Sequence, residues 1–180
     1  MAHMTTLLLL GDSHLALMSD ADVELIAAAC SARQVVGAAV SGSTSSDLSG
    51  QIDAATSTRP AYAVISVGSN DVALGHAHVS LPEYRTNLGT TLHRLSPAYV
   101  VVLGPPPVIE ARVEHGRTNA DLAAYAAAAS DAATEHLATY VRTDAVLGAD
   151  LDQLLEDDGL HLSARGYEKV VAALAEALGG

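Results

Sequence analysis

The chain has 180 residues, of which 49% are hydrophobic, and this is enough for one domain with a full core. The formal net charge of −12 argues against binding to nucleic acid or to an anionic membrane, because phosphates are repelled. The single Cys30 excludes an internal disulfide and a cysteine-based zinc site, and the absence of Trp and Phe argues against a stacking platform for nucleobases.

The N-terminal residues lack the features of a targeting segment. Leu7 to Leu10 are apolar, but Gly11 and Asp12 end this run and no basic region precedes it. We interpret residues 1–3 as additions ahead of a natural start at Met4. No apolar stretch approaches the roughly 20 residues that cross a bilayer. The sequence therefore predicts a cytoplasmic protein without stable membrane insertion.

Five short apolar runs predict β-strands that are buried on both faces, because they do not alternate with polar residues. These runs are residues 7–10, 34–40, 62–67, 99–103 and 139–143. The stretches between them predict helices at residues 21–32 (with Asp20 as N-cap), 47–55, 82–95, 118–137 and 163–178. Alternating strands and helices are typical of a parallel sheet covered on both faces. We therefore predict a single domain over residues 4–180, an α/β fold of three layers (α/β/α) with about five parallel strands.

In such a sheet the ligand site lies beyond the carboxyl ends of the strands, so the loops there are the ones to examine. The first of them contains Gly11-Asp12-Ser13-His14. A serine at this strand-to-helix junction presents its hydroxyl at the sheet edge, and the helix that follows offers free backbone N–H groups to a developing oxyanion. Because Ser and Asp are also the commonest N-caps, this loop taken alone is equally explained as a helix start.

Two further loops carry small polar residues. Gly68-Ser69-Asn70-Asp71 follows the third predicted strand, and the Asn70 amide can donate two hydrogen bonds. Gly42 follows the second predicted strand, where a glycine lets a backbone N–H approach a ligand closely. Each segment is also typical of an ordinary turn, and we expect Asp71 to support the turn around Asn70.

The segment Asp158-Gly159-Leu160-His161 comes directly before the last predicted helix. Asp and His at this spacing in a loop can hydrogen-bond through the carboxylate and Nδ1, which fixes the tautomer and leaves Nε2 free as a base. A surface turn beside a helix cap accounts for the same residues when the segment is taken alone.

Together the four segments resemble the SGNH/GDSL hydrolase family, and the resemblance extends from the first predicted strand to the last predicted helix. The four blocks of the family match Gly11-Asp12-Ser13, Gly42, Gly68-Ser69-Asn70-Asp71 and Asp158-Gly159-Leu160-His161. The resemblance implies a flavodoxin-like strand order. It also implies hydrolysis of a carboxylic ester, through an acyl-enzyme and without a cofactor or metal. Because 180 residues are near the minimum for this architecture, large lid insertions are missing, and we infer an open, shallow site for a small or flexible acyl group.

Residue by residue, the resemblance implies Ser13 as the nucleophile, His161 as the base and Asp158 as the carboxylate that orients it. It further implies an oxyanion hole made of the backbone N–H groups of Ser13 and Gly42 and the side-chain amide of Asn70. The only partner implied is a small-molecule ester substrate.

Three more residues are candidates to line the pocket: His14, His76 and Pro106. His14 stands where the family often has Leu or Ile, and we expect it to pack or to face solvent rather than to react. His76 follows the third block, and Pro106 belongs to the rigid Gly104–Pro107 segment after the fourth predicted strand.

Other functions remain open at this stage. One is a non-catalytic binding module that keeps the fold. Carbohydrate deacetylation and thioester hydrolysis are alternatives within the same family. A metal-dependent hydrolase could use His76 and His78, but no third ligand is evident in the sequence.

Overall fold

The computed structural model of the chain describes residues 5–55, 59–75 and 77–179. Its centre is one sheet of five parallel strands in the order β2-β1-β3-β4-β5. The strands are β1 (Thr6–Gly11), β2 (Gln34–Gly37), β3 (Tyr62–Ser66), β4 (Tyr99–Leu103) and β5 (Thr139–Val141). The predicted α/β fold with five parallel strands in a flavodoxin-like order is confirmed.

The helices between the strands are also close to their predicted positions. They are α2 (Asp20–Ala29), α3 (Leu48–Ala55), α4 (Leu81–Leu95), α5 (Asn119–Glu135) and α8 (Ala164–Gly179). Four short helical segments were not predicted: α1 (Ser13–Ala16), η1 (Ser45–Asp47), α6 (Thr143–Leu147) and α7 (Leu151–Leu154).

The N-cap of α2 was predicted wrongly. Ser19, not Asp20, caps this helix: its hydroxyl accepts a hydrogen bond from the Asp22 backbone N–H at 3.2 Å. The Asp22 carboxylate in turn accepts from the Ser19 backbone N–H at 3.0 Å. This reciprocal pair satisfies two N–H groups at the helix start, which is why the helix begins after Ser19.

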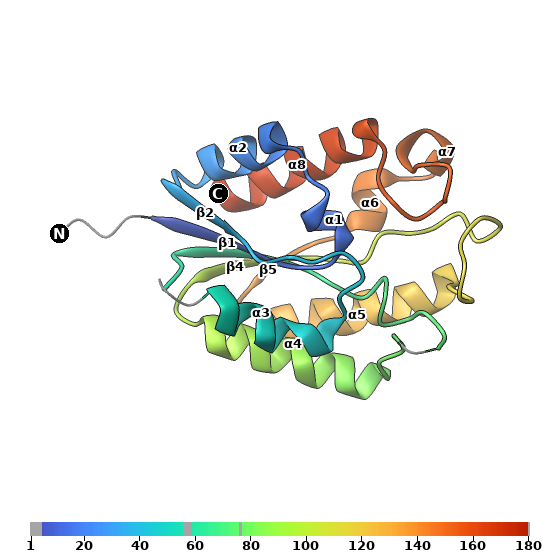
Figure 1. The fold of residues 1–180 in the computed structure, drawn as a ribbon, viewed down its shortest axis with the longest axis horizontal. Coiled ribbons are helices and arrows are strands. Elements are labelled where there is room, and N and C mark those ends of the chain that lie inside the picture. Colours follow the sequence, from blue (N-terminus) through green and yellow to red (C-terminus); the bar gives the residue numbers. More distant parts are fainter. Residues whose placement is uncertain (1–4, 56–58, 76, 180) are drawn as a thin grey trace.

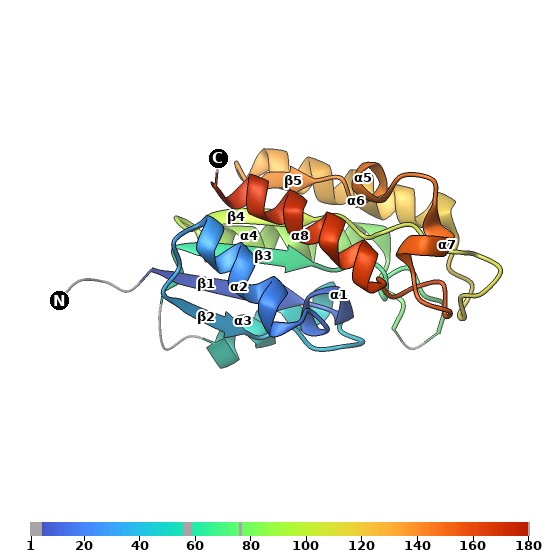
Figure 2. The same cartoon turned by 90° about the horizontal axis from the view of Figure 1, so that it is seen from above.

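The helices cover both faces of the sheet, as Figure 1 shows, with α2 and α8 on one side and α3, α4 and α5 on the other. Neighbouring strand residues point to opposite faces, so Leu7 and Leu9 of β1 belong to the core under α2 and α8, whereas Leu8 and Leu10 belong to the core under α3, α4 and α5. The view from above shows α2 and α8 side by side across the strands (Figure 2).

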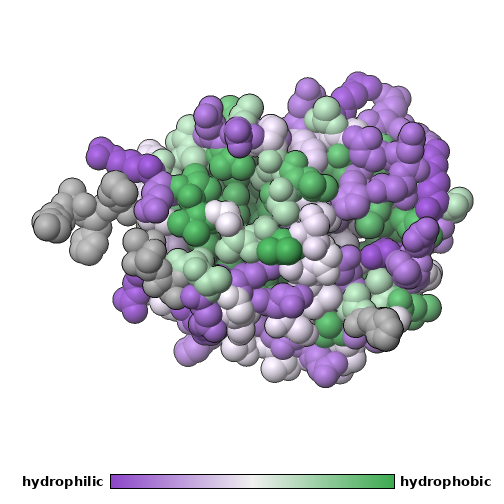
Figure 3. Space-filling view, in the orientation of Figure 1, coloured by the Kyte–Doolittle hydropathy of each residue, from purple (hydrophilic) through white to green (hydrophobic). Residues whose placement is uncertain are grey.

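β2 is an edge strand of the sheet, and an apolar groove of about 580 Å³ runs between it and α3. Figure 3 shows apolar side chains gathered on this face of the molecule. Regular pairing ends at Gly37, short of the predicted Val40. The N–H groups of Ala38 and Val40 nevertheless still donate to the β1 carbonyls of Leu9 and Gly11, both at 2.9 Å. Within the described residues, no helix is long and apolar enough to cross a membrane.

Candidate active site

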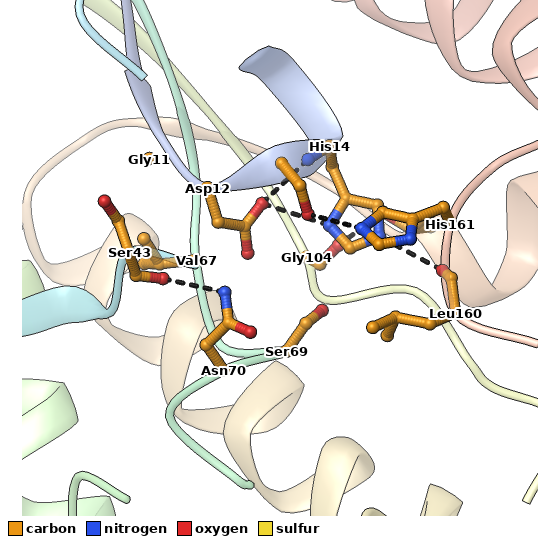
Figure 4. Close-up of polar contacts among 12 residues, drawn as sticks. Gly11, Asp12, His14, Ser43, Val67, Ser69, Asn70, Gly104, Leu160 and His161 are labelled. Carbon is orange, nitrogen blue, oxygen red and sulfur yellow. Dashed lines mark hydrogen bonds and ion pairs between the residues drawn. The ribbon is translucent and has the colours of Figure 1, made fainter. Parts of the chain in front are cut away.

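The four sequence segments lie at the carboxyl ends of the strands. β1 stands between β2 and β3, so the strand order reverses there, and in open α/β sheets ligands bind in the crevice at such a reversal. Figure 4 shows the loops after β1 and β3 facing the segment before α8, with polar side chains directed toward one another.

A continuous chain of hydrogen bonds joins the first and last of these segments. The Ser13 hydroxyl oxygen lies 3.1 Å from Nε2 of His161, although the two residues are 148 positions apart in the sequence. On the far side of the ring, Nδ1 of His161 lies 2.5 Å from a carboxylate oxygen of Asp158. The Ser13 side chain therefore contacts a base whose orientation a carboxylate fixes.

Asp158 is held in its charged form by the turn that contains it. Its second carboxylate oxygen accepts from the backbone N–H groups of Leu160 at 2.9 Å and His161 at 3.0 Å. Partial burial raises the pKa of Asp158, but these two hydrogen bonds and the His161 side chain outweigh it and lower the pKa to about 2. Asp158 is therefore a carboxylate at neutral pH.

The backbone around Ser13 is pinned on both sides. The Asp12 N–H donates to the Ser66 carbonyl of β3 at 2.9 Å, and the Asp12 carboxylate caps α1 by accepting from the His14 N–H. The buried Gln51 side chain of α3 accepts from the Gly11 N–H at 2.7 Å and donates to the Gly11 carbonyl at 2.9 Å. Ser13 is the first residue of α1, where a backbone N–H has no acceptor within the helix.

His14 is fully buried, with 1% of its surface exposed, so it lies under the site rather than at its surface. Its Nδ1 lies 3.0 Å from the Asp12 carboxylate and its Nε2 lies 3.4 Å from the Leu160 carbonyl. Burial lowers the pKa of His14, but Asp12 and the Leu160 carbonyl raise it by more, so the net shift is upward. Of the two placements expected for His14, packing or facing solvent, this burial agrees with packing and not with facing solvent.

Asn70 lies in the loop after β3, and its side chain is directed toward Ser43 (Figure 4). Its amide nitrogen donates to the Ser43 carbonyl at 2.9 Å, which ties the loop after β3 to the loop after β2. Its amide oxygen accepts from the Arg117 guanidinium at 3.1 Å. An amide nitrogen carries two N–H donors, and Ser43 engages one of them.

Asp71, beside Asn70, links the same two loops at a second point. Its carboxylate accepts from the Ser45 N–H at 2.9 Å, and its side chain is completely buried. Burial is the largest influence and raises the pKa of Asp71 to about 6 despite this hydrogen bond. The contact accords with the expectation that Asp71 supports the turn around Asn70.

Two of the remaining predicted site residues, Gly42 and Pro106, lie in segments that follow strands of the sheet. Gly42 is exposed in the loop after β2, next to Ser43, and adopts a φ of 84° that favours glycine. Pro106 is buried in the segment after β4. His76 lies outside the described residues.

A pocket of about 280 Å³ adjoins Asp158 on the side of the loop that precedes α5. Its walls are mostly polar and are formed by Arg112, Val113, Glu114, His115, Arg117, Asp158 and Leu160. Such a lining suits a polar substrate group better than a long hydrocarbon chain. Across the part of the chain that the structure describes, no group of three or more His, Cys, Asp or Glu side chains could hold a metal ion.

The sequence analysis missed two residues that shape this site, Arg117 and Gln51. Both are polar and buried, and each makes two hydrogen bonds to residues 40 or more positions away in the sequence. The sequence gives no local signal for either, because neither belongs to a block or follows a predicted strand.

This arrangement can activate a hydroxyl. A serine oxygen within hydrogen-bond distance of an imidazole, which a carboxylate orients from the other side, is the geometry of a nucleophile with its general base. The neighbouring Asn70 amide is a side-chain donor of the kind that stabilises negative charge developing on a carbonyl oxygen.

A model of the GDSL-like lipase/acylhydrolase family matches residues 9–169 of the chain. Comparison with curated proteins finds no match. Among solved structures, a lipase/acylhydrolase from Enterococcus faecalis is similar with a TM-score of 0.87 and 24% identity, over 98% of this chain and 96% of that one. An acetylxylan esterase from Geobacillus stearothermophilus is similar with a TM-score of 0.81 and 23% identity, over 99% of this chain and 95% of that one.

Proposed function

The chain belongs to the GDSL-like lipase/acylhydrolase family and is a carboxylic ester hydrolase, and from this premise we propose that Ser13 is its nucleophile. In this proposal His161 is the general base, Asp158 orients it, and the substrate is an ester of a small acyl group. The observation that carries the proposal is the hydrogen-bonded chain from the Ser13 hydroxyl through His161 to Asp158.

The reaction follows from this chain in two halves. The Ser13 oxygen attacks the ester carbonyl while Nε2 of His161 takes its proton, and the Asp158 carboxylate stabilises the imidazolium that forms. The tetrahedral intermediate then collapses: the bond to the alcohol breaks and His161 gives its proton to the departing alcohol oxygen. Water repeats these steps on the acyl-enzyme and releases the acid.

The proposed oxyanion hole comprises the backbone N–H groups of Ser13 and Gly42 and the side-chain amide of Asn70. The hydrogen bond from Asn70 to the Ser43 carbonyl supports it, because it brings Asn70 to the loop that contains Gly42. Removal of one such donor costs about 3 kcal/mol of transition-state stabilisation in enzymes of this kind.

A fluorophosphonate probe tests the nucleophile. We expect the probe to label the wild-type protein at Ser13 and to abolish hydrolysis of p-nitrophenyl acetate, whereas Ser13→Ala is neither labelled nor active. Ser49→Ala, which changes a serine of α3 outside the site, is the matched control and should label normally. Labelling that persists in Ser13→Ala, or activity that a chelator removes, would overturn the serine mechanism.

A series of p-nitrophenyl esters tests the acyl group. In this proposal the acyl group enters the small, mostly polar pocket beside Asp158, so kcat/KM should be highest for acetyl or propionyl esters and should fall as the chain lengthens. A rise in kcat/KM from acetyl to decanoyl esters would contradict the proposal of a small acyl group.

Removal of acetyl groups from carbohydrates is a second candidate. It is favoured by the polar walls of the pocket, which could hydrogen-bond a sugar, and by the similarity to the acetylxylan esterase over nearly the whole of both chains. Acetate release from acetylated xylo-oligosaccharides, compared with release from ethyl acetate, whose alcohol is a similarly poor leaving group, tests it. A kcat/KM on the oligosaccharide no higher than that on ethyl acetate would reject it.

A further inference from the structure

Arg117 reaches the proposed oxyanion hole from a part of the chain that none of the four sequence segments includes. It lies just before α5, next to the N-cap Thr118, and only 8% of its surface is exposed. Its guanidinium makes three hydrogen bonds: Nε donates to the Ser69 carbonyl at 2.7 Å, one terminal nitrogen to the Glu114 carbonyl at 2.9 Å, and the other to the Asn70 amide oxygen at 3.1 Å.

These contacts determine which way the Asn70 amide faces. A guanidinium has donors only, so the amide must turn its oxygen toward Arg117 and its nitrogen away. The nitrogen is held at 2.9 Å from the Ser43 carbonyl, which can only accept. Both ends of the amide are therefore fixed, and a flipped amide would place donor against donor on one side and acceptor against acceptor on the other. One N–H of Asn70 is left for a ligand.

The contact also places a positive charge behind the amide. None of the ion pairs among the described residues includes Arg117, whose three acceptors are neutral oxygens. Burial lowers the pKa of the Arg117 guanidinium, and the nearby Asp12 and Glu114 carboxylates partly offset this shift. An arginine nevertheless remains protonated at any physiological pH. A hydrogen bond from a cation polarises the amide and strengthens its N–H groups as donors in a site of low dielectric.

We propose that Arg117 is a positioning residue of the oxyanion hole: it holds the Asn70 amide with its nitrogen toward the reacting carbonyl and makes that nitrogen a stronger donor. The inference rests on the proposed function, because it acts through the role given to Asn70. It adds a buried cation, supplied by the segment before α5, to a site otherwise built from the loops after β1, β2 and β3 and the turn before α8.

A purely structural role makes different predictions. The two contacts with backbone carbonyls join the loop after β3 to the segment before α5. Losing them alone would lower the free energy of unfolding, but it would not weaken binding of the transition state more than binding of the substrate. A residue that acts through the oxyanion donor should instead affect kcat and leave KM unchanged, because the oxyanion exists only in the transition state and the intermediates.

The experiment is steady-state kinetics on p-nitrophenyl acetate for Arg117→Met, Asn70→Ala and the double variant, with thermal melts to verify folding. We expect Arg117→Met to lose about tenfold to a hundredfold in kcat, less than removal of the donor itself, with KM within about twofold. In the Asn70→Ala background the same change should cost no more than about twofold, because the amide through which it acts is gone. Arg85→Met, a surface arginine of α4 paired with Glu135, is the matched control.

A boronic acid supplies a second readout, since it binds a serine oxygen as a tetrahedral adduct that mimics the intermediate. Its inhibition constant should rise in Arg117→Met by the same factor by which kcat falls. If Arg117→Met does not fold, Arg117→Lys serves the test. Lysine keeps the positive charge but cannot reproduce the planar arrangement of the three guanidinium hydrogen bonds, so kcat and boronate affinity should fall together while KM stays unchanged.

The outcomes separate the two proposals. If Asn70→Ala is impaired in kcat but Arg117→Met and Arg117→Lys are not, the inference about Arg117 is wrong and the proposed function stands. Equal losses from Arg117→Met in the wild-type and Asn70→Ala backgrounds also reject it. If Asn70→Ala keeps the wild-type kcat, the oxyanion role of Asn70 fails and the inference fails with it, whereas fluorophosphonate labelling still decides the role of Ser13.

Discussion

Asp12 and His14 flank the proposed nucleophile, and both side chains are withdrawn from solvent although both can carry charge. The acceptors around the His14 ring are a carboxylate on one nitrogen and the Leu160 carbonyl on the other. Because neither partner can donate, the doubly protonated imidazolium fits this setting best. The pair therefore joins the nucleophile loop to the turn that contains His161.

Replacing His14 by Leu, a residue common at this position in the resembled family, should destabilise the protein. The substitution leaves the Asp12 carboxylate buried without its cationic partner, a loss that costs about 3–5 kcal/mol in buried pairs. Urea unfolding at pH 6 measures it. His93→Leu, an exposed histidine of α4, is the control and should stay within about 0.5 kcal/mol of wild type.

The same comparison depends on pH in a defined direction. The pKa of His14 is raised in the folded protein, so its contribution is fully present below the ordinary histidine value of about 6.5 and is lost as pH rises through the raised value. The free-energy difference between wild type and His14→Leu should shrink from pH 6 to pH 9. A difference that stays constant over this range would contradict a His14 side chain that loses its charge between pH 6 and pH 9.

At the scale of single residues, the sequence located those that follow strands or precede the last helix. Ser13 and Asn70 could be placed because parallel strands bring their carboxyl ends to one edge. His161 could be placed because its segment directly precedes the last predicted helix and matches the fourth block of the family. Arg117 could not, since its contact with Asn70 depends on how the segment after β4 folds back over the loop after β3.

Among the elements, β1 and β3 leave no room for a side chain where β1 ends. Gly11 has a φ of 130°, and a Cβ placed there would lie only 1.9 Å from the Ser66 carbonyl oxygen. The side chain of Gln51 in α3 then satisfies both backbone polar groups of this glycine. Two strands and one helix thus fix the point from which the nucleophile loop departs.

Gly11→Ala should therefore destabilise the protein by at least about 3 kcal/mol, because the added methyl overlaps backbone and the conformation disfavours any side chain. Gly37→Ala in β2 is the matched control: nothing lies within 4 Å of its Cβ position, so it should be neutral or slightly stabilising. Urea unfolding of both variants gives the comparison. Similar stabilities for the two would contradict the close approach of β1 and β3.

The long elements were predictable because their apolar runs or alanine-rich stretches are long enough to show a pattern. The short helices α1, α6 and α7 have four or five residues, which is too short for a hydrophobic period to distinguish helix from loop. Ser13 was placed at a strand-to-helix junction, but that it is itself the first residue of α1 appears only in the structure.

For the molecule as a whole, the alternation of strands and helices predicted a parallel sheet, but it did not predict the strand order. That order came from the family resemblance, and it has a direct consequence for the site. Because β1 is flanked by β2 and β3, three loops meet around its carboxyl end, and α8 packs against α2 so that the turn before it faces the same point. The site therefore depends on both ends of the chain.

Ser13 and His161 join these two distant segments of the chain. Ser13 and His161 are useful to the reaction only together, so Ser13→Ala and His161→Ala should each lower kcat by a similar factor of about 10⁴ or more. The double variant should be little worse than either single one, because each removes the same proton transfer. Single-turnover and steady-state kinetics on p-nitrophenyl acetate measure all three, with thermal melts to verify that α8 still docks. Losses that multiply in the double variant would mean that the two residues act independently, and the hydrogen bond between them would then have no part in the reaction.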